Sequence, residues 1–261
     1  MDYLVIAATA FLVSCLTLFS GFGLGTVLMP AFALFFPVPV AVAATAAVHL
    51  ANNLFKLALV GRRADWRMVA RFGLPAALAA IAGASALMLF SDLPTIATYR
   101  LGERIHEVTP VKAVIGLLIV AFAALDLCPP FRGSALPPRF IVLGGLLSGF
   151  FGGLSGNQGA LRSAFLIKAG LDKDAFVGTG VVSTAIVDTV RLAVYGLSFY
   201  TMKWAVMETD IAGPVVAAVV AAFLGAYLGS RLLKKVTLRF VRIVVALTMT
   251  AVGMALVGGL A

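Results

Sequence analysis

Long apolar stretches separated by short polar connections run the whole length of the 261-residue chain. A helix of roughly 20 apolar residues is long enough to cross the hydrocarbon core of a bilayer. In lipid the backbone groups must bond within their own segment, which favours helices. We therefore predict an all-α, polytopic membrane protein, a single transmembrane domain over 1–261 with about eight apolar segments. These are 3–36, 38–60, 68–90, 110–127, 139–168, 175–198, 211–230 and 241–260.

Two of these segments carry glycine-rich interruptions that a continuous helix would disfavour. One is Ser20-Gly21-Phe22-Gly23-Leu24-Gly25, and the other runs from Ser148 to Gly159. Each is followed by a similar course, in which Asn53, Lys56 and Gly61 recur in the same spacing as Asp188, Arg191 and Gly196. The pattern predicts two pseudo-repeats, at about 3–127 and 139–260.

Composition and charge support the membrane interpretation. The chain is 62% apolar and 12% charged, whereas a soluble domain carries about 25% charged residues. Its net charge of +9 lies in short clusters between apolar runs, as the positive-inside rule describes for cytoplasmic loops. We therefore expect a multi-pass protein of the cytoplasmic membrane, and we do not expect nucleic acid as a partner.

The basic clusters also orient the two halves. Eight simple spans would place most of the Lys and Arg residues outside, against the positive-inside rule. If 139–168 instead forms a broken hairpin that enters and leaves on one side, the connections 61–71, 132–139, 168–173 and 231–242 all become cytoplasmic. The second half is then inverted relative to the first, a plan common among secondary transporters. By analogy, 3–36 is either a second hairpin or one span.

Interrupted helices inside a membrane expose backbone groups that need partners. The start of a helix leaves N–H groups unpaired and is partly positive, which suits it to anions. Two such breaks facing one another would form an anion site, and close helix packing at the glycines is the alternative. The candidate substrate-binding residues in the breaks are Ser20, Gly21, Gly23, Gly25, Gly153, Ser155, Gly156, Asn157 and Gln158.

Charged side chains inside the apolar segments extend this candidate site, because charge in lipid is costly and by default suggests function. Arg162 follows the second break and either attracts an anion or lies near the surface. Asp188 and Arg191 share a helix face, so they form either a structural pair or a substrate contact, with Asp188 as a candidate for proton coupling. Lys56 either lines the path or snorkels to the interface.

Uncharged polar residues continue the same stripes. His49, Asn52 and Asn53 lie on one face of the second segment, and Thr179 stands in the sixth. Buried polar groups need partners, so these side chains either bond neighbouring helices or form the wall of a substrate path. We include all four among the substrate-binding candidates.

The sequence offers no enzyme signature. His49 and His106 are its two histidines, which excludes a zinc-type histidine pair, and it has no nucleophile elbow, P-loop or dinucleotide fingerprint. Cys15 and Cys128 suggest neither a disulfide framework nor a metal site. We therefore predict no catalytic residues, no cofactor and no metal.

At its motifs the chain resembles the TauE/SafE (sulfite exporter) family of membrane proteins. The resemblance covers nearly the whole chain and rests on Ser20 to Gly25 with Pro30, Val38-Pro39-Val40, Asn53, Asp65-Trp66, Ser148 to Gly156 and Gly178-Thr179-Gly180. It implies export of a small anion, such as sulfite, sulfoacetate or a related organosulfur compound, across the cytoplasmic membrane. An anionic substrate agrees with the site expected from the residues.

Three functions therefore compete. The first is a secondary transporter that exports a small anion by alternating access, and the second is an anion-selective channel that uses the same breaks as a filter. The third is an intramembrane enzyme or a non-transporting scaffold. The expected partners are the anionic substrate and the lipid bilayer, and a second copy of the chain is a further candidate.

Overall fold

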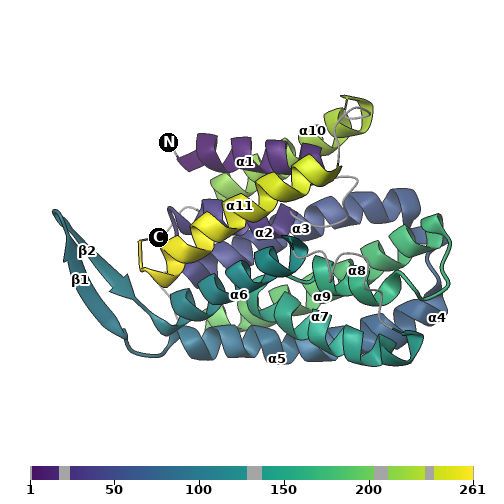
Figure 1. Ribbon diagram of the computed structural model, residues 1–261, viewed down its shortest axis with the longest axis horizontal. Helices are drawn as coiled ribbons and strands as arrows, with labels where there is room; N and C mark the ends of the chain where they lie inside the picture. The colour runs from purple at the N-terminus through teal and green to yellow at the C-terminus, as the bar shows by residue number, and fades with distance from the viewer. Residues whose placement is uncertain (1, 18–23, 128–136, 203–210, 233–237, 261) are drawn as a thin grey trace.

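The computed structural model describes residues 2–17, 24–127, 137–202, 211–232 and 238–260. Its helices run alongside one another as an elongated bundle (Figure 1). They are α1 (Asp2–Thr17), α2 (Leu24–Ala33), α3 (Val38–Val60), α4 (Trp66–Met68), α5 (Leu74–Ser91), α6 (Pro110–Leu127), α7 (Ile141–Ser155), α8 (Gly159–Leu166), α9 (Lys173–Met202), α10 (Ala212–Leu232) and α11 (Leu238–Val257).

Several of these helices have the length and composition to span a bilayer. Among the described residues, five stretches qualify, and shorter apolar helices lie at Tyr3–Cys15, Pro110–Leu125 and Ile243–Val257. The five are Val38–Ala58, Trp66–Ser91, Pro138–Ser155, Lys173–Ser198 and Ala212–Gly229. The expectation of an all-α, polytopic membrane protein is thereby confirmed at this level.

Helices α3 and α9 pack antiparallel and form the centre of the bundle. Gly178, early in α9, lies against the backbone of Val60 and Ala64 at the end of α3, and Arg63 forms an exposed ion pair with Asp174. The connection between α3 and α5 holds two short helical turns, Gly61–Arg63 and Val69–Gly73, on either side of α4. This connection fixes one end of the bundle.

The segment 139–168 is a hairpin and not one traverse. A short turn at Pro138–Phe140 leads into α7, which ends at Gly156 in the left-handed conformation, φ 80°. Helix α8 then folds back, so that Phe165 packs on Gly144 and Ser148 donates to the carbonyl of Gln158 (Oγ to O, 3.1 Å). Both ends of the hairpin therefore lie on the same side, as the positions of the basic residues predicted.

The segment 3–36 also reverses. Helix α2 turns into α3 at 34–37 and runs antiparallel to it, since Gly25 lies against His49. Helix α1 runs in the opposite direction to α2, parallel to α10, with Tyr3 beside Gly213 and Cys15 beside Gly229. At ten residues, α2 is about 15 Å long, half of a roughly 30 Å hydrocarbon core. Residues 3–36 are therefore not one straight span.

Glycines allow the closest helix contacts in the bundle. Gly145, Gly149 and Gly153 on α7 lie directly on backbone carbonyls of the 69–91 region, and a Cβ at any of them would collide with those carbonyls. Gly225 and Gly229 on α10 meet the carbonyls of Phe11 and Cys15 on α1 in the same way. Such contacts between small residues are typical of membrane helices, whose association depends on close packing.

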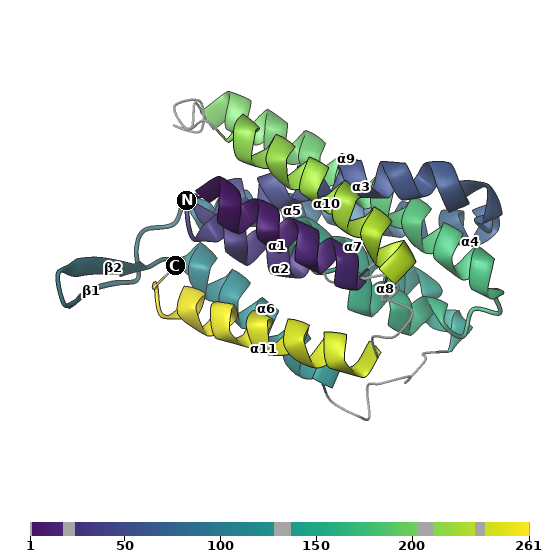
Figure 2. The same cartoon turned by 90° about the horizontal axis from the view of Figure 1, so that it is seen from above.

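The two ends of the bundle differ in character. We name the end at the 61–73 connection the basic end, because exposed basic residues gather there: Arg62, Arg63, Arg67, Arg71, Arg139, Lys168 and Lys173. The opposite end carries a β-hairpin of β1 (Ala97–Leu101) and β2 (Arg104–Val108) beside both termini (Figure 2). We name it the hairpin end. The sequence pattern did not predict these strands.

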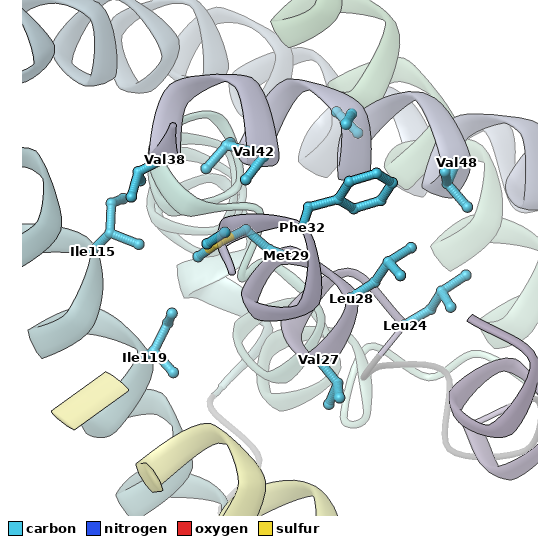
Figure 3. Packing of buried hydrophobic residues seen from close by; sticks show 14 of the residues in the cluster. Leu24, Val27, Leu28, Met29, Phe32, Val38, Val42, Val48, Ile115 and Ile119 are labelled. Atoms are coloured by element: carbon cyan, nitrogen blue, oxygen red, sulfur yellow. The ribbon is translucent and has the colours of Figure 1, made fainter. Parts of the chain in front are cut away.

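Helices α6 and α11 complete the bundle as an antiparallel pair. Gly116 on α6 packs against Gly253 on α11, and Tyr99 and His106 of the β-hairpin contact Gly258 and Gly259 just after α11. The apolar core fills the space between α2, α3 and α6. Figure 3 shows Met29 and Phe32 of α2 beneath Val42 of α3, with Ile115 of α6 on the side of Met29.

Candidate functional site

Polar side chains from α3 form a stripe that faces α9. Thr45, His49, Asn52, Asn53 and Lys56 recur at spacings of three and four residues, so they share one face of the helix. Asn52 and Asn53 are buried. The stripe lies in the middle of the bundle because α3 crosses α9 there.

Asp188, on α9, lies at the centre of a cluster of polar side chains that includes part of this stripe. Its Oδ2 lies 2.7 Å from Nδ1 of His49 and accepts from Nδ2 of Asn53 at 3.2 Å. Its Oδ1 accepts from Nε of Arg191 at 3.0 Å and from Nε2 of Gln158 at 3.3 Å. The carboxylate is fully buried, so these four side chains replace the water that it would otherwise need.

Arg191 is both an ion-pair partner and a cap. Its Nη2 lies 2.7 Å from Oδ1 of Asp188, in a geometry that makes an ion pair but not a hydrogen bond. Its Nη1 donates to the carbonyl of Gly152 at 3.2 Å, and the hydroxyl of Tyr195 donates to the carbonyl of Gly153. The carbonyl of Gly152 also accepts from the backbone N–H of Gly156 at 3.0 Å, whereas later carbonyls of a helix have no intrahelical partner. Two side chains of α9 therefore cap the end of α7.

The tip of the α7–α8 hairpin lies directly on this cluster. Gly156 is the turning point, and a Cβ there would come within 2.9 Å of Nη1 of Arg191. Asn157 donates to Oγ of Ser155 at 3.2 Å. The positive φ and the tight contact both require glycine at this position.

The two glycine-rich elements meet. Gly25, in the first turn of α2, is placed so that its Cβ would lie 3.6 Å from the carbonyl of Gly156 and 3.8 Å from Cδ2 of His49. The start of α2 and the turn between α7 and α8 thus meet in the middle of the bundle. Ser20, Gly21 and Gly23, predicted for the same site, lie outside the described residues.

Two further cationic side chains lie near the ion pair of Asp188 and Arg191. Arg162 on α8 is buried, donates to the hydroxyl of Thr184, and lies against Gly180. Lys56 of the α3 stripe is close enough to Arg162 for the two positive charges to repel. This places Arg162 inside the bundle and not at its surface.

One predicted residue belongs elsewhere. The hydroxyl of Thr179 accepts from the backbone N–H of Asp65 at 3.0 Å, so it fastens α9 to the 61–73 connection.

Conversely, sequence reasoning did not single out Tyr195. Its position four residues after Arg191, on the same helix face, was the available signal.

Some buried polar atoms in this region make no hydrogen bond within the described part of the chain. They are Oγ1 of Thr45, Oδ1 of Asn52, Oδ1 of Asn157 and Oγ of Ser183. Buried polar atoms are normally paired, so the cluster has unused capacity to bind polar groups. In the same part of the chain, no three His, Cys, Asp or Glu side chains gather as metal ligands would.

Comparison with known proteins gives one match. A family model described as "Sulfite exporter TauE/SafE" matches residues 6–256, a range that includes both glycine-rich breaks and the whole cluster around Asp188. Neither the curated proteins nor the solved structures provided a match.

Proposed function

The chain belongs to the sulfite exporter TauE/SafE family, and on this premise we propose that it carries a small organosulfur or sulfite-like anion across the cytoplasmic membrane by alternating access. The family is one of membrane transporters of sulfur anions. The exact anion and the mechanism are the proposal. The contact of Gly25, in the first turn of α2, with the carbonyl of Gly156, in the turn between α7 and α8, is the observation that carries it.

The proposed mechanism rests on two inverted halves, about 3–127 and 139–260, within one transmembrane domain. Three features support them. The α1–α2 hairpin opens toward the hairpin end, and the α7–α8 hairpin opens toward the basic end. Helix α1 packs along α10 as α7 packs along α5. Helices α3 and α9, and α6 and α11, pair antiparallel, as counterparts of two inverted halves would.

We assign the basic end to the cytoplasm. The exposed residues Arg62 to Arg71, Arg139, Lys168 and Lys173 gather there. The end of α10 and the start of α11, with Arg231, Arg239 and Arg242, point toward the same end by the direction of their helices. The positive-inside rule associates such clusters with the cytoplasmic face.

Charge and backbone together favour an anion as the substrate. Asp188 faces Arg191, and Arg162 and Lys56 bring two further positive charges to the same region. The starts of α2 and α8 add partly positive helix ends. A small oxyanion placed here would receive hydrogen bonds from backbone N–H groups and from cationic side chains.

Counterflow in proteoliposomes tests the proposal. Vesicles loaded with unlabelled sulfite, sulfoacetate or thiosulfate are diluted into trace labelled anion, and a carrier is expected to accumulate the label transiently. Ohmic anion current without counterflow would identify the channel instead. Neither flux nor anion-dependent thermal stabilisation would leave the non-transporting scaffold.

A further inference from the structure

The hydrogen-bond pattern around His49 fixes which nitrogen of its ring carries the proton. Nδ1 lies 2.7 Å from Oδ2 of Asp188, and an ionised carboxylate can only accept hydrogen bonds. Nδ1 must therefore be the donor. Because Nδ1 is a donor, the nearby amide of Asn53 directs its own N–H to Asp188, at 3.2 Å. In the neutral ring, Nε2 then holds the lone pair.

Asp188 is arranged to remain a carboxylate. Each of the four side chains on it is a donor: His49, Asn53, Gln158 and Arg191. A proton on either carboxylate oxygen would compete with one of these donors and would leave Arg191 without a counter-ion. Asp188 therefore acts as a positioning group, and the titratable group of this contact is His49.

The Cγ–Cδ2 edge of the His49 ring faces the place where the hairpins meet. Cδ2, which is bonded to Nε2, lies next to Gly25, whose neighbour is the carbonyl of Gly156. The His49 side chain is 16% exposed, whereas that of Asp188 is 0% exposed. Within the described residues Nε2 makes no hydrogen bond. The His49 ring is thus partly accessible and lies next to the proposed anion site.

The surrounding charges couple protonation to anion binding. From α9, Asp188 faces the ring and is itself paired with Arg191. Lys56 on α3 and Arg162 on α8 add positive charge to the same region. A protonated His49 ring would form an ion pair with Asp188. A bound anion would favour the charged form of the ring. By linkage, the charged ring would raise the affinity for the anion by the same factor.

We propose that His49 is the proton site of this carrier. Nε2 takes a proton from water on the side where the anion binds, while Nδ1–H stays on Asp188. On the opposite side the new N–H bond breaks and the proton leaves to water with the anion, so that one proton moves with each anion. This assignment rests on the proposed transport function and replaces Asp188 as the coupling candidate.

The test uses the full-length protein in proteoliposomes with sulfoacetate, whose two acid groups are both ionised at neutral pH. The variants are His49→Gln, which keeps an amide donor for Asp188 but cannot take a proton, and His106→Gln. The latter is the matched control, because His106 is the other histidine and lies in β2, at the hairpin end. A trapped pH dye reports proton movement during net uptake, and counterflow reports exchange.

The parent and His106→Gln are expected to move about one proton per anion, the capacity of one imidazole nitrogen. His49→Gln is expected to move almost no protons per anion transported, and its counterflow should fall as well, because the charged ring no longer favours the anion. Proton movement that persists in His49→Gln, or net uptake by the parent without protons, would overturn the assignment. An absence of counterflow in the parent would overturn the proposed function itself.

Two further measurements cover the case in which His49→Gln fails to fold. The parent in weak buffer should take up about one proton when sulfoacetate binds in detergent, and no uptake between pH 6 and 8 would contradict the proposal. Asp188→Asn removes the charge that stabilises the protonated ring, so its pH profile of exchange should move to lower pH. An unchanged profile would refute the positioning role.

Discussion

Asn53 donates a hydrogen bond to Asp188, Nδ2 to Oδ2 at 3.2 Å, although the two residues are 135 positions apart in the chain. They are also the residues that correspond in the two sequence halves. Corresponding residues of the two proposed inverted halves can touch only near the axis that would relate them. This contact, where α3 crosses α9, is therefore where we expect that axis and the substrate site to coincide.

The pair of Asp188 and Arg191 should matter more to stability than any surface pair. We expect Asp188→Asn to lower the free energy of unfolding by about 3 kcal/mol, because it leaves a buried guanidinium without its counter-charge. The control is Asp174→Asn, which breaks the exposed pair with Arg63 and should cost at most about 1 kcal/mol. Denaturant unfolding in detergent measures both. Equal losses of unfolding free energy in the two variants would contradict the assignment of Asp188 to a buried ion pair.

Arg162 should contribute more to anion binding than Lys56. Arg162 is buried beside the hairpin tip, whereas Lys56 is only partly buried. A hydrogen bond to a charged group contributes about 1.5–3 kcal/mol, so Arg162→Ala should weaken sulfoacetate or sulfite binding about tenfold or more.

Calorimetric titration of detergent-purified protein measures this, with Lys56→Ala as the comparison. Arg191→Ala is expected to weaken binding as well, because it removes the cap on α7 and the positive charge that pairs with Asp188. If all three variants bind as the parent does, the anion does not bind at this cluster.

Gly156 should be required for transport for a reason that Gly102 does not share. Both glycines have positive φ, 80° and 63°, but a Cβ at Gly102 meets nothing within 4 Å, whereas one at Gly156 meets Arg191. Alanine in the left-handed region costs about 1–2 kcal/mol at either position. Gly156→Ala should therefore abolish counterflow and Gly102→Ala should preserve it. Comparable counterflow in both would place the tip outside the transport path.

Accessibility labelling should place the two ends of the bundle on opposite faces of the membrane. In a variant without Cys15 and Cys128, we introduce Arg71→Cys or Lys173→Cys at the basic end and Glu103→Cys in the β-hairpin. An impermeant thiol reagent applied outside intact cells should label only the last. Outside labelling at Arg71→Cys would reverse the assigned orientation, and opposite results for the two basic-end sites would rule out the inverted halves.

The sequence predicted one of the two contacts of Arg191 and not the other. Three-residue spacing predicted that Asp188 and Arg191 share a face, and they do pair. The spacing could not show that Arg191 also caps α7 at Gly152, because that contact joins segments far apart in the chain. The same limit applies to Thr179, whose polarity was visible in the sequence but whose hydrogen-bond partner, Asp65, was not.

The sequence by itself determined the membrane class, the family, the two glycine interruptions and the grouping of the basic residues, because these depend on composition, local periodicity and the exclusion of charge from lipid. Only the tertiary structure decided that the breaks meet at Gly25 and Gly156 and that donors surround Asp188. Those contacts depend on how α3, α7 and α9 pack together, and no local pattern encodes which faces of distant helices come into contact.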